Sequence, residues 1–281
     1  MPELPEVETM RRGVLSLCGQ KIAKVLDPEC RCRPLQMRPN MEGLQKRLTG
    51  HDVVAVERIG KRVVIVLSDQ SRLIIEPRMS GIVLLGDVPS REHVRLILQF
   101  DDGQTMLFWD RRGLGTVTLM TASKFQQWSD SGVIGPDALL IDRPALKARL
   151  GGSRRAIKPA LLDQRAVAGI GNMYAAEILH LAGIDPRTRC DRLSNPQWDR
   201  IVAATRRVLN QAIDYEGSTL SDGTYRNALN DPGGFQNYLQ VYDRHSQTCA
   251  RCAEGTIRRI VQSQRSTFFC PVCQKRSGLH V

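Results

Sequence analysis

The sequence contains no apolar run long enough to cross a membrane. Its longest apolar stretches, such as Val63–Leu67, are only five residues long, whereas a membrane-spanning helix needs about 20. A secretory signal is also absent from the first residues, which are acidic where such a signal is basic. Internal repeats and low-complexity tails are lacking as well. We therefore expect a cytoplasmic globular protein.

The chain does have an excess of positive charge. Its 281 residues include 40 Lys and Arg against 29 Asp and Glu, which gives a net charge of +11 at pH 7. That length is sufficient for two domains of ordinary size, each with its own core. A strongly basic protein favours a polyanionic partner, most often nucleic acid. A membrane surface is the alternative, but no basic amphipathic helix stands out.

Residues 4–18 and 21–120 differ in their hydrophobic pattern. Val7, Met10 and Val14 follow helical spacing and Gly19 is a natural stop, so we predict one amphipathic helix over 4–18. Short β-rich runs follow: Lys21–Leu26, Asp52–Arg58, Arg62–Leu67, Arg72–Glu76, His93–Phe100, Thr105–Trp109 and Thr116–Met120. These runs predict an antiparallel sandwich or barrel. A parallel α/β sheet would need helices between the strands, and the pattern shows none.

The second half of the chain is mainly helical in pattern. We predict helices over 158–164, 174–182 and 195–215, the last capped by Asn195 with Pro196 at its first position. Residues 217–237 are rich in turn-forming types and predict a long loop. Two β-like segments follow within 239–273. The expected fold class is therefore α+β with more than one domain.

Four of the eight cysteines form the strongest local motif. They follow the pattern Cys249-x2-Cys252-x17-Cys270-x2-Cys273. Two such pairs can bind one Zn²⁺ tetrahedrally at a β-hairpin, and four thiolates leave no open position, so we expect a structural ion. A redox pair or a disulfide framework is the alternative, which a cytoplasmic location disfavours. The other four cysteines are scattered and expected to be free thiols: Cys18, Cys30, Cys32 and Cys190.

The cysteine pairs bracket a basic segment. Arg258, Arg259 and Arg265 lie between them, and the chain from Arg244 onward has seven Lys or Arg residues against one acidic residue. Arginines on a rigid hairpin suit contacts with phosphate groups. A solvated basic face is the alternative, but the position of Arg265 in the middle of the hairpin favours the phosphate contact.

A Gly-rich turn between two predicted helices is a candidate anion site. The first helix begins at Lys158, and the backbone amides of Gly169–Asn172 come just before the second helix. Amides at a helix N-terminus bind phosphate well, and the Asn172 side chain adds a donor. A plain helical hairpin, with Gly for tight packing, is the alternative.

The chain begins with the residues MPELPEVE. Removal of Met1 would leave Pro2 as an N-terminal secondary amine beside the carboxylates of Glu3 and Glu6. This set supplies a nucleophile, an acid and a base. The alternative is an ordinary helix start, where proline is tolerated and acidic residues complement the helix dipole. This stretch by itself favours the helix start.

Three motifs together resemble the formamidopyrimidine-DNA glycosylase (MutM) family of base-excision enzymes. They are MPELPEVET at the start, the KP…DQ…VAGIGN-YA-E stretch in the middle and CxxC…QRST-F-CPVCQ near the end. They occur in the family's order, and Leu4 favours this branch over the endonuclease VIII branch, which reads PEGPE. The resemblance implies a bifunctional DNA glycosylase and apurinic/apyrimidinic lyase. Such an enzyme removes oxidised purines, such as 8-oxoguanine and formamidopyrimidines, from duplex DNA and cuts the strand by β,δ-elimination.

The resemblance also implies how the chain is organised. We expect a catalytic β-sandwich domain with an N-terminal helix (1–135), a linker (136–156), a helix–two-turns–helix DNA-binding domain (157–240) and a zinc-ribbon finger (241–281). One structural Zn²⁺ is the implied cofactor, and damaged double-stranded DNA is the implied partner. The protein is expected to act as a monomer in a bacterial cytoplasm, at the nucleoid.

Carried over to this sequence, the resemblance assigns roles to five residues. Pro2 is the nucleophile at C1′ and Glu3 the proton donor at the sugar. Glu6 assists proton transfer or orients the lesion. Lys61, on a turn between two strands, contacts DNA at the lesion, with a plain surface lysine as the alternative. Arg265 contacts DNA and supports catalysis.

The family flips the damaged base out of the duplex and fills the gap with a Met, an Arg and a Phe. Met79, in the segment RMSG, and Arg112, in the segment DRRGLG, take the first two roles here. Arg112 would face the orphaned cytosine. Leu114 stands where Phe is usual and offers no aromatic stacking. Further DNA contacts are implied at His93, Lys158, Gly171, Asn172 and Tyr242.

The segment 221–235 is longer than the family loop that caps the flipped base. It therefore does not indicate which lesion is preferred. Two alternative functions stay open at this point. One is an endonuclease VIII-type glycosylase for oxidised pyrimidines, and the other is a non-catalytic zinc-ribbon DNA-binding protein.

Overall fold

The computed structural model describes residues 1–28, 30, 32–220 and 223–275. The chain divides into two compact units: unit 1 is Met1–Ser131 with Ala212–Gln236, and unit 2 is Gly132–Gln211 with Asn237–Val281. Each unit therefore combines two separate stretches of the chain. The domain limits predicted from the sequence were contiguous ranges, and they remain predictions. In the described part of the chain, no helix is both long and apolar enough to span a membrane.

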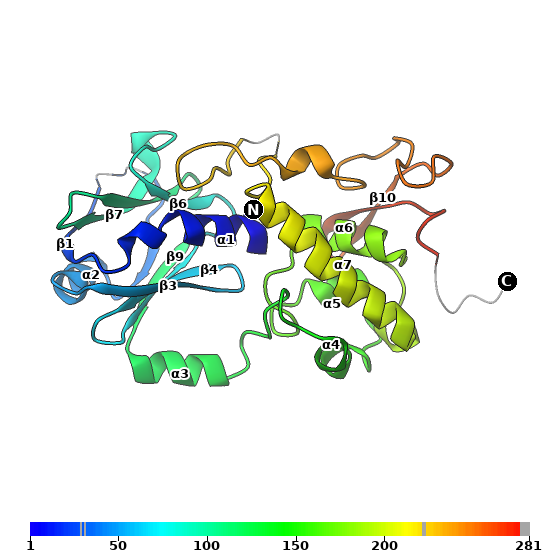
Figure 1. Cartoon of the computed structure of the whole chain (residues 1–281), viewed down its shortest axis with the longest axis horizontal. Coiled ribbons are helices and arrows are strands. Elements are labelled where there is room, and N and C mark those ends of the chain that lie inside the picture. The colour runs from blue at the N-terminus through cyan, green and yellow to red at the C-terminus, as the bar shows by residue number, and fades with distance from the viewer. Residues whose placement is uncertain (29, 31, 221–222, 276–281) are drawn as a thin grey trace. The chain divides into compact units, whose positions relative to one another are not determined.

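The described residues of unit 1 form two β-sheets (Figure 1). Among the described residues, four strands pair in the order β1-β7-β8-β6 and five in the order β2-β9-β5-β4-β3. The β2–β9 pair is parallel, and the other described pairs in these sheets are antiparallel. The strands are β1 (Ile22–Leu26), β2 (Gln36–Arg38), β3 (Val53–Ile59), β4 (Arg62–Leu67), β5 (Arg72–Glu76), β6 (Gly81–Leu85), β7 (Val94–Phe100), β8 (Thr105–Asp110) and β9 (Thr116–Met120).

All the predicted strands of this region are confirmed, with ends shifted by no more than one residue. Strand β2 was missed because it has only three residues. Strand β6 was also missed, although it is a continuous apolar run like the correctly predicted β4. The expectation that no helix lies between the strands is wrong, since α2 (Met41–Leu48) lies between β2 and β3. A second unpredicted helix, α3 (Ala122–Asp130), follows β9 and has no buried residue.

Helix α1 (Leu4–Gly13) belongs to the core of unit 1. Val7, Met10 and Val14 are fully buried among apolar side chains of both sheets. The helix contacts β3 and β4 of one sheet and β6 of the other (Figure 1). The predicted helix over 4–18 stops early, because the chain tightens into a 3₁₀ turn at Leu15–Leu17. The two sheets therefore fix the position of the first helix.

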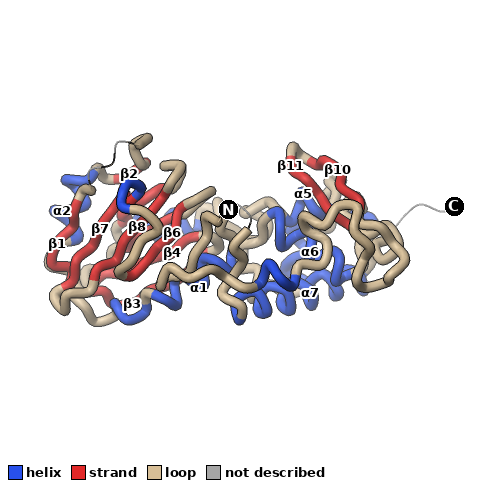
Figure 2. The backbone as a smooth tube through the Cα atoms, turned by 90° about the horizontal axis from the view of Figure 1, so that it is seen from above, coloured by secondary structure: helices blue, strands red, loops and turns tan. Residues whose placement is uncertain are grey.

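The described part of unit 2 is helical, with one β-hairpin (Figure 2). Its elements are α4 (Arg143–Leu150), α5 (Ile157–Leu161), α6 (Asn172–Ala182), most of α7 (Asn195–Asp214), β10 (Arg258–Gln262) and β11 (Arg265–Phe269). Further 3₁₀ turns of the chain cover Arg91–His93, Cys190–Arg192 and Phe235–Tyr238. Helix α4 lies inside the segment that we expected to be a linker. Helix α7 begins at Asn195 as predicted, but Asn195 is its first helical residue and not its cap. Ser194 precedes the helix, and its backbone N–H donates to the Gln197 side chain at 2.8 Å.

Helix α6 is the centre of unit 2. Its residues from Met173 to His180 are all buried, and it packs against α5 and β11. A helix that is apolar on nearly every side must be enclosed by other elements. The N-terminus of α6 and the hairpin β10–β11 are therefore held close together. The α+β fold class with a sandwich, a helical domain and a β-hairpin is confirmed.

Candidate active site and nucleic-acid interface

The start of α1 holds Pro2 and Glu3 in a buried position. Glu3 is the N-cap of α1 and only 3% exposed, and Pro2 is buried beside it. The Glu3 carboxylate accepts a hydrogen bond from the Glu6 N–H, and the Glu6 carboxylate accepts one from the Glu3 N–H at 2.9 Å. This reciprocal pair is a capping box. The ordinary helix start is thus present, and it also brings both carboxylates next to the peptide between Pro2 and Glu3.

The second oxygen of Glu6 binds a distant segment of unit 1. It accepts a hydrogen bond from the backbone N–H of Ser218 at 2.9 Å. The preceding residue, Gly217, has φ +80°, and a Cβ there would lie 2.9 Å from the Glu6 side chain. The Tyr225 hydroxyl donates to the carbonyl oxygen of Glu216 at 2.9 Å, and it lies 3.4 Å from that of Glu6. The segment from 216 to 225 is therefore attached to the first turn of α1. Ser221 and Asp222, within the loop that departs from the family, lie outside the described residues.

Glu8 connects α1 to the turn that carries Lys61. Its carboxylate accepts hydrogen bonds at 2.8 to 3.0 Å from three arginines: Arg11, Arg12 and Arg58. Burial raises the pKa of Glu8, but these arginines lower it more, so its pKa lies below the ordinary value. Arg58 also donates to the carbonyl oxygen of Gly60 at 3.1 Å. Lys61 follows Gly60 in the β3–β4 turn and is half-buried.

The predicted wedge residues lie on two turns of unit 1. Met79 is 39% exposed between β5 and β6, and Arg112 is exposed after β8. Leu114, farther along the second turn, is half-buried. Gly81 pairs with Asp110 across the neighbouring strands β6 and β8. Both turns therefore leave the sheet at the same end.

His93 is mostly enclosed by its neighbours. Its Nε2 lies 3.1 Å from a carboxylate oxygen of Glu92, and its Nδ1 lies 3.5 Å from Sγ of Cys32. The ring meets Trp109 edge-on, with 5.4 Å between centroids. Only 16% of the side chain is exposed. The DNA contact of His93 remains a prediction.

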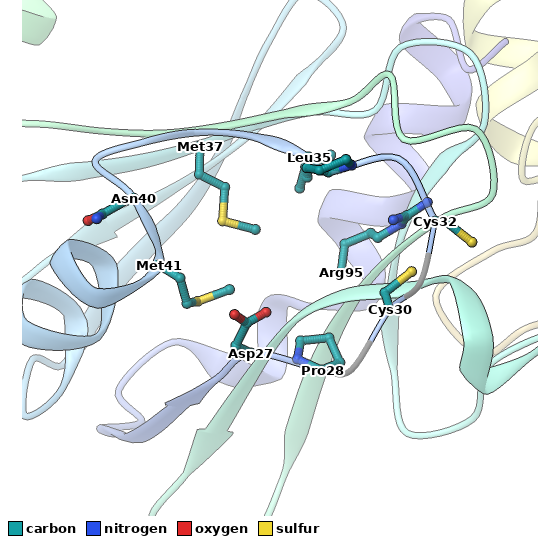
Figure 3. A pocket seen from close by; sticks show the side chains of 10 residues that line it. Asp27, Pro28, Cys30, Cys32, Leu35, Met37, Asn40, Met41 and Arg95 are labelled. Carbon is teal, nitrogen blue, oxygen red and sulfur yellow. The ribbon is translucent and has the colours of Figure 1, made fainter.

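A pocket of about 340 Å³ lies elsewhere in unit 1 (Figure 3). Its lining includes two thiols, two thioethers and one guanidinium, from Cys30, Cys32, Met37, Met41 and Arg95. None of the residues predicted for catalysis or DNA binding lines it, although the lining residue Cys32 lies 3.5 Å from Nδ1 of His93. The cysteines Cys18, Cys30, Cys32 and Cys190 are free thiols, as expected.

Lys158, in unit 2, is 1% exposed. Its ammonium donates to Oδ1 of Asn172 at 2.6 Å, to the carbonyl oxygen of Ser266 at 3.0 Å and to the hydroxyl of Thr267 at 2.9 Å. Asn172 in turn donates to the same Ser266 oxygen at 3.1 Å. An ammonium group has three protons, and three acceptors inside the protein already match them. Lys158 therefore joins the α6 N-terminus to the hairpin, and a direct DNA contact has no geometric support.

The Gly-rich turn before α6 is built around Gln164. Its side-chain N–H donates to the carbonyl oxygen of Ile170 at 2.8 Å, and its side-chain oxygen accepts from the Gly169 N–H at 2.9 Å. The Gly169 amide is thus used within the turn, which reduces the anion site predicted over Gly169–Asn172. Gly171 directly precedes α6 as its N-cap and is buried.

Arg265 begins β11 at the tip of the hairpin and is exposed. It pairs with Gln262, so the connection has two residues, Ser263 and Gln264, with φ +48° and +60°. Positive φ at both positions is the pattern of a tight type I′ hairpin. Arg259 donates to the Ser266 hydroxyl at 2.8 Å. The hairpin tip is thus a short, rigid support for one exposed guanidinium.

Glu177 orients the segment that carries Tyr242. It is 3% exposed, and its carboxylate accepts the backbone N–H groups of Gln240, Val241 and Tyr242 at 2.8 to 3.0 Å. Burial raises the pKa of Glu177, while these three amides lower it. The Tyr242 ring lies edge-on to Phe268 of β11, with 5.3 Å between centroids. Glu177 belongs to the KP…DQ…VAGIGN-YA-E motif, but the motif by itself does not indicate this role.

The four paired cysteines meet at one point of unit 2. All four Sγ atoms lie within 4.8 Å of one another. The distance is 3.8 Å between Cys249 and Cys273 and 3.7 Å between Cys252 and Cys270. A tetrahedral site with Zn–S bonds of about 2.3 Å has sulfur–sulfur edges of about 3.8 Å. The sulfurs therefore already have the spacing that Zn²⁺ requires.

Backbone amides support negative charge at this cluster. The Gly255 N–H donates to Cys252 Sγ at 3.3 Å, and the Cys273 N–H donates to Cys270 Sγ at 3.4 Å. The amides of Glu254 and Gly255 lower the pKa of Cys252 to about 6, while burial raises that of Cys270. Four thiolates this close repel one another, so a divalent cation is needed for all of them to ionise together.

Three family models match the chain in sequence order. They are the formamidopyrimidine-DNA glycosylase N-terminal domain over residues 1–117, the formamidopyrimidine-DNA glycosylase H2TH domain over 134–224 and the zinc finger found in FPG and IleRS over 246–276. The last match contains all four clustered cysteines. The chain therefore has a zinc finger that binds one structural Zn²⁺.

Full-length relatives agree with these matches. The chain is 38% identical to the formamidopyrimidine-DNA glycosylase of Dinoroseobacter shibae, over 98% of this chain and 100% of that protein. It is also similar to the solved structure of Lactococcus lactis Fpg with abasic-site DNA, with a TM-score of 0.87 and 33% identity. A variant of that protein with Fapy-dG-containing DNA gives a TM-score of 0.86 and 35% identity. Both comparisons cover 98% of this chain and 100% of the other. The chain belongs to the formamidopyrimidine-DNA glycosylase family.

Proposed function

We propose that this chain, once Met1 has been removed, is a bifunctional DNA glycosylase and abasic-site lyase that excises oxidised purines from duplex DNA. The observation that carries the proposal is the N-terminus, where the capping box of α1 holds Glu3 and Glu6 next to Pro2. The three family matches cover the chain in the expected order and support the same activity.

The chemistry follows from the secondary amine of Pro2. Its nitrogen lone pair attacks C1′ of the damaged nucleoside, the bond from C1′ to the base breaks, and the base leaves with a proton. Glu3 supplies the proton at the sugar, which opens the ring and gives an iminium ion. The positive charge acidifies the C2′ proton. Loss of that proton expels the 3′-phosphate, and a second elimination expels the 5′-phosphate. The zinc ion supplies only fold stability, because four cysteines leave no coordination site open.

Glu6 has a positioning role in this proposal. Its two carboxylate oxygens accept the N–H groups of Glu3 and Ser218 at 2.9 Å each. These bonds orient the peptide that follows Pro2 and the segment that follows Gly217. Proton transfer by Glu6 itself would require one of these bonds to break.

The substrate class follows from the relatives. The Lactococcus lactis protein was solved with abasic-site DNA and, as a variant, with Fapy-dG-containing DNA. We assign the same lesion class to this chain. Met79 and Arg112 replace the flipped base, and Arg265 contacts a phosphate near the lesion. The protein works as a monomer on the DNA of a bacterial cytoplasm.

Borohydride trapping tests the activity directly. The processed protein is incubated with abasic-site duplex and sodium borohydride, and we expect a covalent adduct that mass spectrometry maps to Pro2. A chain that retains Met1 should form none, because its proline nitrogen is an amide. Absence of an adduct from a chain shown to lack Met1 would refute the enzymatic proposal and leave a DNA-binding protein.

Two substitutions separate the roles of the N-terminal residues. Pro2→Gly should weaken trapping, and Glu3→Gln should abolish base excision. Glu57→Gln is the matched control, because Glu57 is an exposed carboxylate on β3, and it should leave both activities unchanged. A lesion panel completes the test: faster excision of thymine glycol than of 8-oxoguanine opposite cytosine would contradict the purine assignment.

A further inference from the structure

Two buried polar side chains, Ser80 and Asp110, connect the turns that carry Met79 and Arg112. Ser80 is 1% exposed and Asp110 is fully buried. The Ser80 hydroxyl donates to Oδ1 of Asp110 at 2.5 Å. The backbone N–H of Arg112 points at both groups, 3.0 Å from the Ser80 hydroxyl oxygen and 3.2 Å from Asp110 Oδ1. Ser80 directly follows Met79 in the chain, and the backbone N–H belongs to Arg112 itself. These hydrogen bonds therefore link the backbones of the two predicted wedge residues.

The other carboxylate oxygen of Asp110 closes the second turn. It accepts the Gly115 N–H at 2.8 Å. The buried carboxylate of Asp110 thus binds the first turn through Ser80. It also binds the start of the second turn through Arg112 and the end of that turn through Gly115. Burying a carboxylate is costly unless each oxygen has donors. Here the donors are the two turns themselves, so neither can move without leaving buried charge unsatisfied.

Further contacts around Asp110 constrain the second turn. Arg95 is 4% exposed, and it donates to the Asp110 carbonyl oxygen at 2.8 Å and to the Arg33 carbonyl oxygen at 3.0 Å. Its guanidinium lies at the wall of the pocket in Figure 3. Gly113 has φ +60°, and a Cβ there would lie 2.7 Å from the Arg33 oxygen. The second turn is therefore fixed by the Asp110 carboxylate and also by the contacts that Arg95 and Gly113 make near the Arg33 carbonyl oxygen.

We propose that Asp110 and Ser80 are positioning residues that hold Met79 and Arg112 as a single rigid wedge, so that the two side chains enter the duplex together. The inference rests on the proposed function, because it assigns both residues to the gap left by the flipped base. It adds that their joint placement is set inside the protein before DNA binds. Asp110 and Ser80 themselves touch no DNA, and they act only through the turns.

The test compares two reactions of the same protein. Base excision from duplex DNA needs the wedge, whereas borohydride trapping at an abasic site in a single strand has no base stack to fill. Asp110→Asn keeps the size of the side chain but turns an N–H group toward the N–H of Gly115 or Arg112. We expect its excision rate to fall about 100-fold, mainly in kcat, as for a misplaced group near the reaction centre. Trapping on the single strand should change by less than about threefold, because that reaction does not use the wedge.

Three further variants make the result decisive. Asp102→Asn is the matched control, because Asp102 is exposed and also accepts the N–H two residues on, that of Gln104. It should leave both reactions unchanged. Ser80→Ala should repeat the Asp110→Asn pattern, and Ser80→Thr, which keeps the hydroxyl, should restore excision in part. If Asp110→Asn fails to fold, Ser80→Ala carries the same comparison.

Coupling distinguishes positioning from a general loss of stability. Met79→Ala alone should slow excision. In the Ser80→Ala background, however, the same substitution should lower the excision rate by less than about a further twofold, because the wedge is already disordered. Multiplicative effects would overturn the proposal, as would equal losses of excision and single-strand trapping, or full excision activity in both Asp110→Asn and Ser80→Ala. Failure of the proposed function is a separate outcome, in which the unmodified protein neither traps nor excises.

Discussion

The carboxylate of Glu6 accepts a hydrogen bond from the backbone N–H of Ser218, 212 residues farther along the chain, at 2.9 Å. Its other oxygen accepts the Glu3 N–H at the same distance. The N-terminal peptide and the 217–218 turn thus share one buried carboxylate. Gly217 makes this approach possible, because any larger residue would meet the Glu6 side chain.

Replacing Glu6 with Gln should therefore impair function more than its small change in size suggests. An amide has one acceptor oxygen, so its NH₂ group must face the N–H of Glu3 or Ser218. We expect a loss of about 1 to 3 kcal/mol in unfolding free energy, the cost of an unsatisfied buried group. Excision should slow at least about tenfold, because the peptide after Pro2 is misplaced. Single-turnover excision and thermal unfolding measure both effects, and Glu57→Gln is the control. Unchanged excision would contradict the positioning role.

The Glu8 cluster predicts a stability that depends on pH. Its arginines hold the folded-state pKa of Glu8 below the value of 4.5 that describes the unfolded chain. The stabilisation is therefore complete above that value and is lost as the pH falls through the folded-state pKa. Glu8→Gln should cost about 2 kcal/mol at pH 7, and this difference from the unmodified protein should shrink below pH 4.5. Thermal midpoints measured from pH 7 into acid check this. A difference that stays constant in acid would refute it.

Salt dependence separates the roles of Arg265 and Lys158. Arg265 is exposed at the hairpin tip, whereas Lys158 is buried with three internal acceptors. Arg265→Ala should reduce the slope of log Kd against log salt by about 0.9, the value for one lost phosphate contact on duplex DNA. Lys158→Met should leave the slope unchanged and lower the thermal stability. A reduced slope without loss of stability in Lys158→Met would show that this lysine contacts DNA directly.

Zinc removal should unfold the ribbon and abolish specific DNA binding. We expect one Zn²⁺ per chain by elemental analysis, and release of the metal by a strong chelator should be followed by reaction of the four ribbon thiols. Cys252→Ala should lose the ion, because a structural site needs all four ligands. Cys18→Ser is the matched control, since Cys18 is an exposed free thiol. Full DNA affinity in metal-free protein would contradict a structural role.

The secondary structure was largely predictable because it depends on local pattern. The strands of unit 1 other than β2 and β6, and the helices α5 to α7, follow from hydrophobic period and turn residues. Helices α2 and α3 were missed for local reasons too, since one contains Gly43 and the other buries no side chain. The zinc ligands were predictable because CxxC spacing brings two sulfurs together within a single turn. Pro2 and Glu3 were predictable because they are neighbours in the chain.

Only the tertiary structure decided which distant groups share a hydrogen bond. Ser218 meets Glu6, and Asp110 meets Ser80, because strands and turns far apart in the sequence are packed together. The residue type predicts an exposed side chain for Lys158, yet this lysine is buried between α6 and the hairpin. No local pattern encodes such contacts, since burial depends on what the rest of the chain places around a residue. The sequence by itself thus determined the reactive groups and the metal ligands, and the packing of the fold decided how each is held.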